Sequence, residues 1–142
     1  MIKAMEVMHE RSNGLGGGFA AYGIYPEYKD HYAFHIFYSD RNARMETESF
    51  LKERFEIVQA EVIPTHQIPE ITDVPLIWRY FLSPLRSIVE REMIDEDEYT
   101  VRAVTKINST IDGAYVFSSG KNMGTFKAVG YPEDVGVFYK ID

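Results

Sequence analysis

The amino-acid sequence predicts an α+β fold, with two helices packed on one face of an antiparallel sheet. Residues 31–38 alternate in the manner of a strand, whereas residues 43–53 and 95–111 carry apolar side chains at helical spacing. The remaining apolar runs are short and end near proline or glycine, which is typical of further strands. Since 142 residues suffice for one hydrophobic core but hardly for two, we expect a single domain.

The first 30 residues predict a helix, a glycine-rich loop and a short strand. Residues 1–9 carry apolar side chains at helical spacing and stop before a glycine cluster. That cluster consists of Gly14, Gly16, Gly17 and Gly18. Residues 19–24 are apolar and end at Tyr25-Pro26-Glu27, because proline cannot donate in a strand ladder. We therefore expect a short strand over residues 19–24.

The central strand and the helix after it are the clearest elements. One face of the strand carries Tyr32, Phe34, Ile36 and Tyr38, and the other carries His31, Ala33, His35 and Phe37. Ser39, Asp40 and Asn42 offer oxygens that can cap a following helix. The apolar stripe of that helix consists of Ala43, Thr47, Phe50 and Leu51.

Two further strands follow. Residues 57–63 are rich in β-branched side chains and end at Pro64. The next loop contains Pro69 and Asp73, and Pro75 then opens a strand that Ser83-Pro84 ends. Leu76, Trp78, Tyr80 and Leu82 share one face of it. Residues 85–93 form either a short helix or an irregular connector.

The last third of the chain predicts a helix, two strands and a terminal helix. Asp95 or Asp97 can cap the first helix, which Asp112-Gly113 ends. Its expected apolar stripe is Val101, Val104, Ile107 or Asn108, and Ile111. Residues 114–117 and 125–129 resemble strands around a hairpin turn at 118–122. Pro132 fits the first turn of a short C-terminal helix.

The order strand, helix, strand, strand, helix, strand predicts a ferredoxin-like β-α-β-β-α-β sandwich with an N-terminal helix and glycine-rich loop and a short C-terminal helix. Within the single domain 1–142, residues 1–30 hold the helix, the loop and a short strand. Residues 31–120 form the ferredoxin-like core, and residues 121–142 hold a hairpin strand and the terminal helix.

Composition excludes several classes of function. The chain has no cysteine, which rules out disulfides, thiolate metal ligands and a thiol nucleophile within it. A net charge of -7 is the wrong sign for phosphate neutralisation, so we expect no nucleic-acid partner. No apolar run is long enough to span a membrane, and the N-terminus lacks the pattern of a secretory signal. We therefore expect a cytoplasmic protein without a membrane partner.

Several clusters could carry chemistry, but each has a simpler interpretation. The glycine cluster follows a helix and precedes a strand, the reverse of a phosphate-binding loop, so we interpret it as a loop that needs positive φ and close backbone approach. His31 and His35 share a strand face, but a metal site there would need distant carboxylates. The acidic residues at 90–98 fit a solvated helix start. Ser118 and Ser119 fit a turn, without a nucleophile elbow.

Two segments resemble a known family. Residues 8–23, MHERSNGLGGGFAAYG, resemble the arginine–glycine segment of class II glutamine amidotransferases, in the version found in glutamate-synthase-type amidotransferase subunits. Residues 111–135, IDGAYVFSSGKNMGTFKAVGYPEDV, resemble the part just before the glutamine-binding residues. The resemblance covers an internal part of the family's Ntn-type catalytic domain. It places Arg11, Asn13, Gly14 and Gly16 as scaffold beside the family's active site.

The resemblance implies glutamine hydrolysis and ammonia supply in nitrogen metabolism. The family's N-terminal cysteine, its Asn-Gly pair and its downstream arginine-x-proline-threonine stretch have no counterpart here. The chain is either a fragment or separately encoded portion of such a protein or a degenerate relative. We predict no catalytic, cofactor-binding or metal-binding residues in it. The expected partners are the rest of the amidotransferase or the glutamate synthase subunits.

Two other hypotheses stay open. One is a stand-alone ferredoxin-like module that binds a small ligand or oligomerises, and apolar residues on both faces of the strands at 31–38 and 76–82 allow a homo-oligomer. The other is a metal-dependent hydrolase that uses His31 and His35.

Overall fold

The computed structural model describes residues 17–65, 76–128 and 139. These residues form an α+β fold with two antiparallel sheets and three α-helices. In chain order the elements are β1 (Gly17–Tyr22), η2 (Pro26–Tyr28), β2 (Tyr32–Tyr38), α2 (Arg41–Lys52), β3 (Phe55–Val62), β4 (Leu76–Pro84), α3 (Arg86–Glu92), α4 (Glu96–Thr110), β5 (Ala114–Ser118) and β6 (Met123–Ala128). η2 is a single turn of 3-10 helix.

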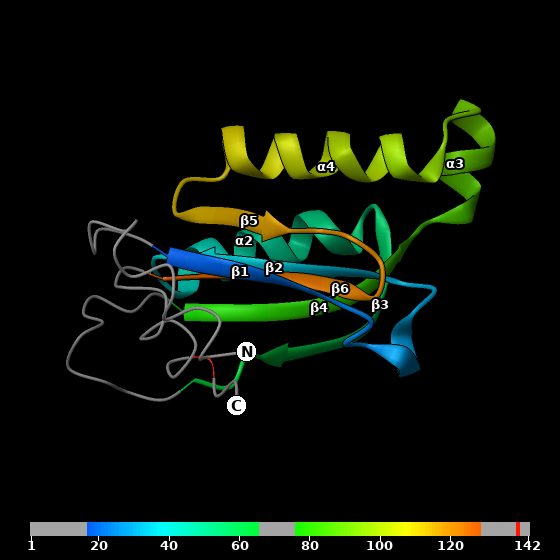
Figure 1. The fold of residues 1–142 in the computed structure, drawn as a ribbon. Coiled ribbons are helices and arrows are strands. Elements are labelled where there is room, and N and C mark those ends of the chain that lie inside the picture. The colour runs from blue at the N-terminus through cyan, green and yellow to red at the C-terminus, as the bar shows by residue number, and fades with distance from the viewer. Residues whose placement is uncertain (1–16, 66–75, 129–138, 140–142) are drawn as a thin grey trace.

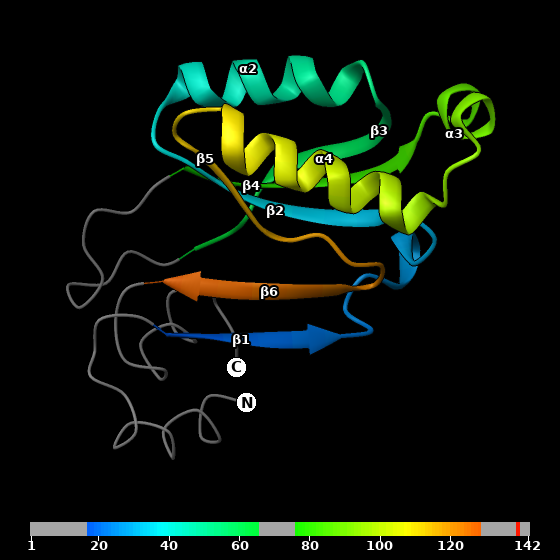
Figure 2. The same ribbon diagram turned by 90° about the horizontal axis from the view of Figure 1, so that it is seen from above.

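The two sheets and the helices lie in three layers. The larger sheet has four strands in the order β3-β4-β2-β5, and each neighbouring pair is antiparallel. The helices α2 and α4 cover one face of this sheet, and β1 and β6 cover the other (Figures 1 and 2). β1 pairs with β6 as a separate two-stranded antiparallel sheet. β2 therefore lies in the middle of the described molecule.

Local sequence explains where the helices begin. Asp40 is the N-cap of α2, and its Oδ1 accepts a hydrogen bond from the backbone N–H of Ala43 at 2.8 Å. Asp95 caps α4 in the same way and accepts from the backbone N–H groups of Asp97 and Glu98. The acidic side chains of the first turn of α4 then lie at the positive end of the helix dipole. The expected capping role of this acidic run is confirmed at Asp95.

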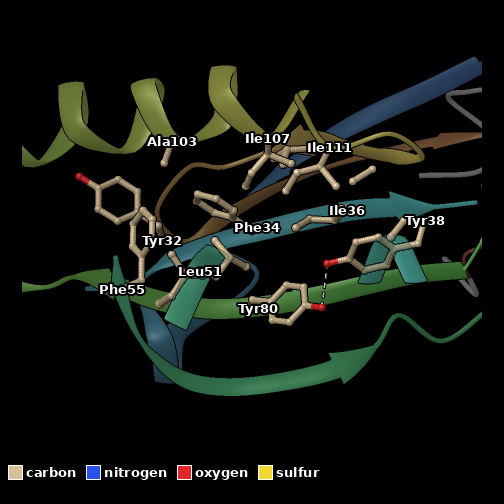
Figure 3. Packing of buried hydrophobic residues seen from close by; sticks show 14 of the residues in the cluster. Tyr32, Phe34, Ile36, Tyr38, Leu51, Phe55, Tyr80, Ala103, Ile107 and Ile111 are labelled. Carbon is tan, nitrogen blue, oxygen red and sulfur yellow. Dashed lines mark hydrogen bonds between the residues drawn. The ribbon is translucent and has the colours of Figure 1, made fainter. Parts of the chain in front are cut away.

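The main hydrophobic core lies between the helices and the four-stranded sheet (Figure 3). The buried residues that form it are Tyr32, Phe34, Ile36, Tyr38, Ala43, Leu51, Phe55, Tyr80, Leu82, Tyr99, Ala103, Ile107, Ile111, Ala114 and Val116. The hydroxyl groups of Tyr38 and Tyr80 are 2.8 Å apart within it. They give each other a hydrogen-bonding partner where water is excluded. The predicted alternation of β2 is thus confirmed on its helix-facing side.

A second cluster fills the space between the two sheets. It consists of Ile63, Ile77, Phe117, Phe126 and Tyr139, with Phe19, Ala21, Ile24 and Phe37 packed against it. Phe19 of β1 stacks on Phe126 of β6 with ring centroids 4.9 Å apart. The apolar side of β2 that faces away from the helices is therefore covered by this chain's own strands. That face provides no surface for a second copy.

Three details of the sequence prediction are wrong. Residues 118–122 do not join a hairpin, because β5 belongs to the four-stranded sheet and β6 pairs with β1. Gly17 and Gly18 do not lie in a loop but begin β1. A Cβ at Gly18 would lie 2.6 Å from the carbonyl oxygen of Phe126, so the close backbone approach expected of the glycines occurs within a strand pair.

The third correction is the position of Val101 on α4. Val101 is 61% exposed, whereas Tyr99, Ala103 and Ile107 are buried. These three repeat every four residues and continue into the buried C-cap residue Ile111. The expected stripe is confirmed at Val104, Ile107 and Ile111, which pack in the main core, but Tyr99 and Ala103 take the place expected of Val101. Gly113 follows the helix with φ of 83°, as the Asp112-Gly113 stop predicts.

The remaining expectations divide into those the structure addresses and those it does not. Residues 86–92 are helical, which decides between the two alternatives for that stretch. β4 extends through Pro84, which pairs with Phe55 at the edge strand β3. The predicted helix at 1–9, the loop containing Pro69 and Asp73, and the helix from Pro132 lie outside the described residues. None of the helices in the described segments has the length and apolar character needed to cross a bilayer.

Candidate functional site

A chain of buried and partly buried polar contacts begins at His35, in the middle of β2. This side chain lies between the two sheets and is 0% exposed. Its Nδ1 lies 2.9 Å from the carbonyl oxygen of Thr125 in β6, and its Nε2 lies 2.7 Å from the hydroxyl of Tyr25. Both ring nitrogens therefore have hydrogen-bonding partners inside the protein.

The partners determine which nitrogen of His35 carries the hydrogen. A carbonyl oxygen can only accept, so Nδ1 must donate to Thr125. In the neutral ring Nε2 is then the acceptor, and the Tyr25 hydroxyl donates to it. The neutral Nδ1–H tautomer is thus the form that satisfies both contacts.

The hydrogen-bonding chain continues to the surface through Arg79 of β4. Its Nη1 donates to the Tyr25 hydroxyl at 3.1 Å, and its Nε and Nη2 donate to Oε1 of Glu61 at 3.0 and 2.8 Å. The Arg79 guanidinium also lies 5.0 Å from the centroid of the Tyr25 ring. We call these four residues, Glu61, Arg79, Tyr25 and His35, the β2–β4 polar chain.

Burial controls the ionisation of the polar chain. Desolvation lowers the pKa of His35 to about 4, opposed by the hydrogen bond to Thr125 and supported by the positive charge of Arg79. A charged imidazole would also place a second donor against Tyr25, which already accepts from Arg79. Burial likewise raises the pKa of Tyr25, although Arg79 opposes the shift. Near neutral pH His35 is therefore uncharged, whereas Arg79 is positively charged.

The loop before β6 holds Tyr25 in position. The backbone N–H of Tyr25 donates to Oδ1 of Asn122 at 2.7 Å, and the backbone N–H of Gly23 donates to the carbonyl oxygen of Asn122 at 2.6 Å. Asn122 has φ of 51°, a left-handed conformation that asparagine tolerates better than most residues. Gly124 packs so closely that a Cβ there would lie 2.4 Å from Cε1 of His35. Backbone and side chains together enclose the ring.

This geometry supports a structural role for His35. With no exposed surface and both nitrogens occupied, the ring cannot reach a substrate proton without first breaking a buried hydrogen bond. Ser118 is also buried, and its hydroxyl accepts from the backbone N–H of Thr125 at 2.9 Å. The polar chain joins β2, β3, β4 and β6 with the segment around η2.

The hypothesis of a metal-dependent hydrolase that uses His31 and His35 can be compared directly with these contacts. Nδ1 of His31 lies 2.7 Å from Oγ of Ser83 in β4, so His31 and His35 have different partners. The described residues contain no group of three or more His, Cys, Asp or Glu side chains placed to hold a metal ion. Arg11, Asn13, Gly14 and Gly16, the scaffold residues predicted from the family resemblance, lie outside the described residues. His9 and His66 also lie outside them.

Sequence reasoning missed that Tyr25, Arg79 and Glu61 form a polar chain with His35. One signal was present, because Arg79 interrupts the apolar run Leu76–Leu82 and a charge on a central strand requires a partner. Glu61 lies opposite Arg79 in the β3–β4 register. The partnership with Tyr25, however, depends on a tertiary contact between residues 54 positions apart.

Comparison with known proteins gives one informative relative. No family model matches the chain. An uncharacterized protein of Archaeoglobus fulgidus is 49% identical over 142 residues, an alignment that covers 99% of this chain. The chain spans 37% of the length of that relative.

Proposed function

We propose that this chain is a non-catalytic part of a glutamine amidotransferase-like protein of the glutamate synthase type. The observation that carries the proposal is the pairing of β1 with β6. β1 belongs to the segment 8–23 and β6 to the segment 111–135, the two stretches that resemble the family. They lie about a hundred positions apart in the sequence, yet Phe19 pairs with Phe126 in the β1–β6 register. Such convergence is expected if both segments belong to one family domain.

The central elements support a ferredoxin-like arrangement for the remainder of the domain. The elements β2, α2, β3, β4, α4 and β5 follow the order of a β-α-β-β-α-β unit, and their strands are arranged β3-β4-β2-β5. Each helix connects two strands that are separated by one intervening strand. We infer that this unit supplies packing and partner contact.

The contacts of His35 support a non-catalytic role. Its ring ties the four-stranded sheet to β6, within the second family-like segment, through Thr125. The scaffold role proposed for the glycine segment leads to the same interpretation, since Gly18 allows β1 to approach β6 closely. Catalysis would then belong to other parts of the complete protein, where glutamine hydrolysis supplies ammonia.

The proposed partners are the rest of the amidotransferase or the glutamate synthase subunits. The 49% identical relative is much longer than this chain, which is compatible with a domain that works beside others. The coding sequence on either side of this chain offers a direct test. A cysteine codon a few tens of residues upstream, or an arginine-x-proline-threonine segment just downstream, would support a fragment.

The claim of inactivity has its own experiment. The purified 142-residue chain is incubated with glutamine, and ammonia and glutamate are measured against a heat-denatured sample. We expect no release above the denatured control, because the chain has no cysteine to act as the family nucleophile. Release of ammonia that increases in proportion to the amount of folded protein would overturn the claim.

The alternative is a stand-alone ferredoxin-like module that binds a small ligand or oligomerises. It is favoured by one observation: both faces of β2 are covered by elements of this chain, which permits independent folding. Thermal unfolding with glutamine, glutamate and 2-oxoglutarate separates the two functions. A clear rise in Tm with one ligand supports the module, whereas unchanged Tm with all three supports the non-catalytic part.

A further inference from the structure

A second feature lies in the helical layer, on the face of the four-stranded sheet opposite β1 and β6 (Figure 2). Residues of α2, α3 and α4 and of the segments that follow α2 and α3 surround an open pocket of about 410 Å³. Figure 1 shows α3 beside the start of α4, at one end of the helical layer. The volume falls in the usual range for small-molecule pockets.

The inner wall of this helical pocket is apolar. Phe50, Ile88 and Ile94 line it, and all three are half-buried against the main core. Tyr99 also lines the pocket, and its hydroxyl donates to the carbonyl oxygen of Arg54 at 2.9 Å. The wall can therefore accept a hydrocarbon or aromatic group without leaving the Tyr99 hydroxyl unpaired.

The rim of the helical pocket is positively charged, although the chain as a whole is acidic. Four basic and two acidic residues line the pocket, in a chain of net charge -7. Arg102 is paired with Glu98 at 2.7 Å, and the Arg54 guanidinium lies 3.7 Å from the centroid of the Phe50 ring. Within the described segments, Arg91 and Lys106 form no ion pair. Their charge is available to a ligand.

We propose that the helical pocket binds a small organic carboxylate with an apolar body. Arg91 and Lys106 would attract the carboxylate, and the Arg91 guanidinium can offer it two parallel N–H donors. The apolar body would lie on Phe50, Ile88 and Ile94. Glu53 and Glu92 on the same rim oppose a dense negative charge, which favours a monoanion over a polyanion.

The test uses 4-phenylbutyrate as the carboxylate probe and 4-phenylbutan-1-ol as its uncharged analogue. Each is titrated into the full chain while backbone amide signals are followed by NMR. We expect saturable shifts confined to α2, α3 and α4, with at least about fivefold weaker binding of the alcohol. Shifts elsewhere, or equal binding of the two probes, would overturn the proposal.

A matched pair of variants isolates the rim charges. Arg91→Glu combined with Lys106→Glu should weaken 4-phenylbutyrate binding by about tenfold or more, with little effect on the alcohol. Lys29→Glu combined with Arg41→Glu changes the net charge equally but lies outside the pocket lining. This control should bind the carboxylate within about twofold of the unmodified chain. Equal weakening in both pairs would show that net charge, not this pocket, attracts the probe.

Discussion

The Nδ1 atom of His35 donates a hydrogen bond to the carbonyl oxygen of Thr125, 2.9 Å away. His35 lies in the four-stranded sheet and Thr125 in the two-stranded sheet, which do not share a backbone ladder. The buried His35 side chain therefore links the two layers through an oriented hydrogen bond, and the buried Ser118 hydroxyl adds a second link by accepting from the Thr125 N–H. The strength of the His35 hydrogen bond depends on the solvent exclusion that also keeps the imidazole neutral.

The stability of the protein should decrease in mild acid because of His35. Its pKa is about 4 when folded and close to 6.5 when unfolded, so the unfolded chain binds more protons between these values. The contribution of the neutral His35 to the free energy of unfolding is complete above pH 6.5. It decreases as the pH falls, and about 3 kcal/mol of it is lost at pH 4. Urea unfolding at pH 7 and pH 4 measures it.

The control for this pH effect is a comparison of two histidines. His35→Gln removes the buried imidazole. Between pH 7 and pH 4 its free energy of unfolding should therefore decrease by about 3 kcal/mol less than that of the unmodified chain. His31→Gln changes a half-buried ring that contacts Ser83 instead. It is the matched histidine replacement that leaves the buried His35 in place. The same pH dependence in His35→Gln and the unmodified chain would contradict the assignment.

Arg79 should contribute more to stability than its ion-pair partner Glu61. Arg79→Met leaves the Tyr25 hydroxyl without its donor in a partly buried site, and we expect a loss of about 1–2 kcal/mol in the free energy of unfolding. Glu61 is 39% exposed, so Glu61→Gln should lose no more than about 1 kcal/mol. Denaturant unfolding at neutral pH gives both values. A larger loss for Glu61→Gln than for Arg79→Met would contradict the greater contribution of Arg79.

Gly124 should tolerate no side chain while His35 is present. The added Cβ of Gly124→Ala would overlap the imidazole ring, and we expect a loss of about 2 kcal/mol or more. Gly23→Ala has open space around it but φ of 71°, so it should lose only about 1 kcal/mol. Combining Gly124→Ala with His35→Ala should then be less harmful than the two separate losses added together. Strict additivity would argue against the contact.

The hydroxyl pair of Tyr38 and Tyr80 should show energetic coupling. Tyr38→Phe removes one partner from a buried pair 2.8 Å apart and should destabilise the protein by about 1–2 kcal/mol. Removing both hydroxyls should lose less than the sum of the two single changes, since neither group is then left alone. A double-mutant cycle by chemical unfolding measures the coupling, and a value near zero would contradict it.

The orientation of α4 predicts opposite effects for two apolar residues. Val101 is 61% exposed, so Val101→Glu should change stability by no more than about 0.5 kcal/mol. Ile107 is fully buried in the main core, so Ile107→Ala should lose about 2–5 kcal/mol. Thermal unfolding of both variants compares them. A severe loss for Val101→Glu would show instead that Val101 is buried, as the sequence predicts.

The sequence alone determined most elements of the central unit. Alternation across residues 31–38 identified β2, and helical spacing with the Asp40 cap identified α2. These patterns are local, because a buried face leaves an apolar period of two or 3.6 residues in the chain itself. On α4 the expected stripe is right at Val104, Ile107 and Ile111 but wrong at Val101, because Tyr99 and Ala103 give a weaker apolar signal although they are buried.

Only the tertiary structure decided what covers each face and what His35 contacts. Periodicity indicates that a strand has an apolar side but not which partner covers it, so β6 was assigned to β5 as a hairpin instead of to β1. The neutral Nδ1–H tautomer of His35 depends on its contacts with Tyr25 and Thr125, which lie on different segments of the chain. Hydrogen-bond direction and desolvation depend on atoms brought together by folding, and sequence spacing does not record them.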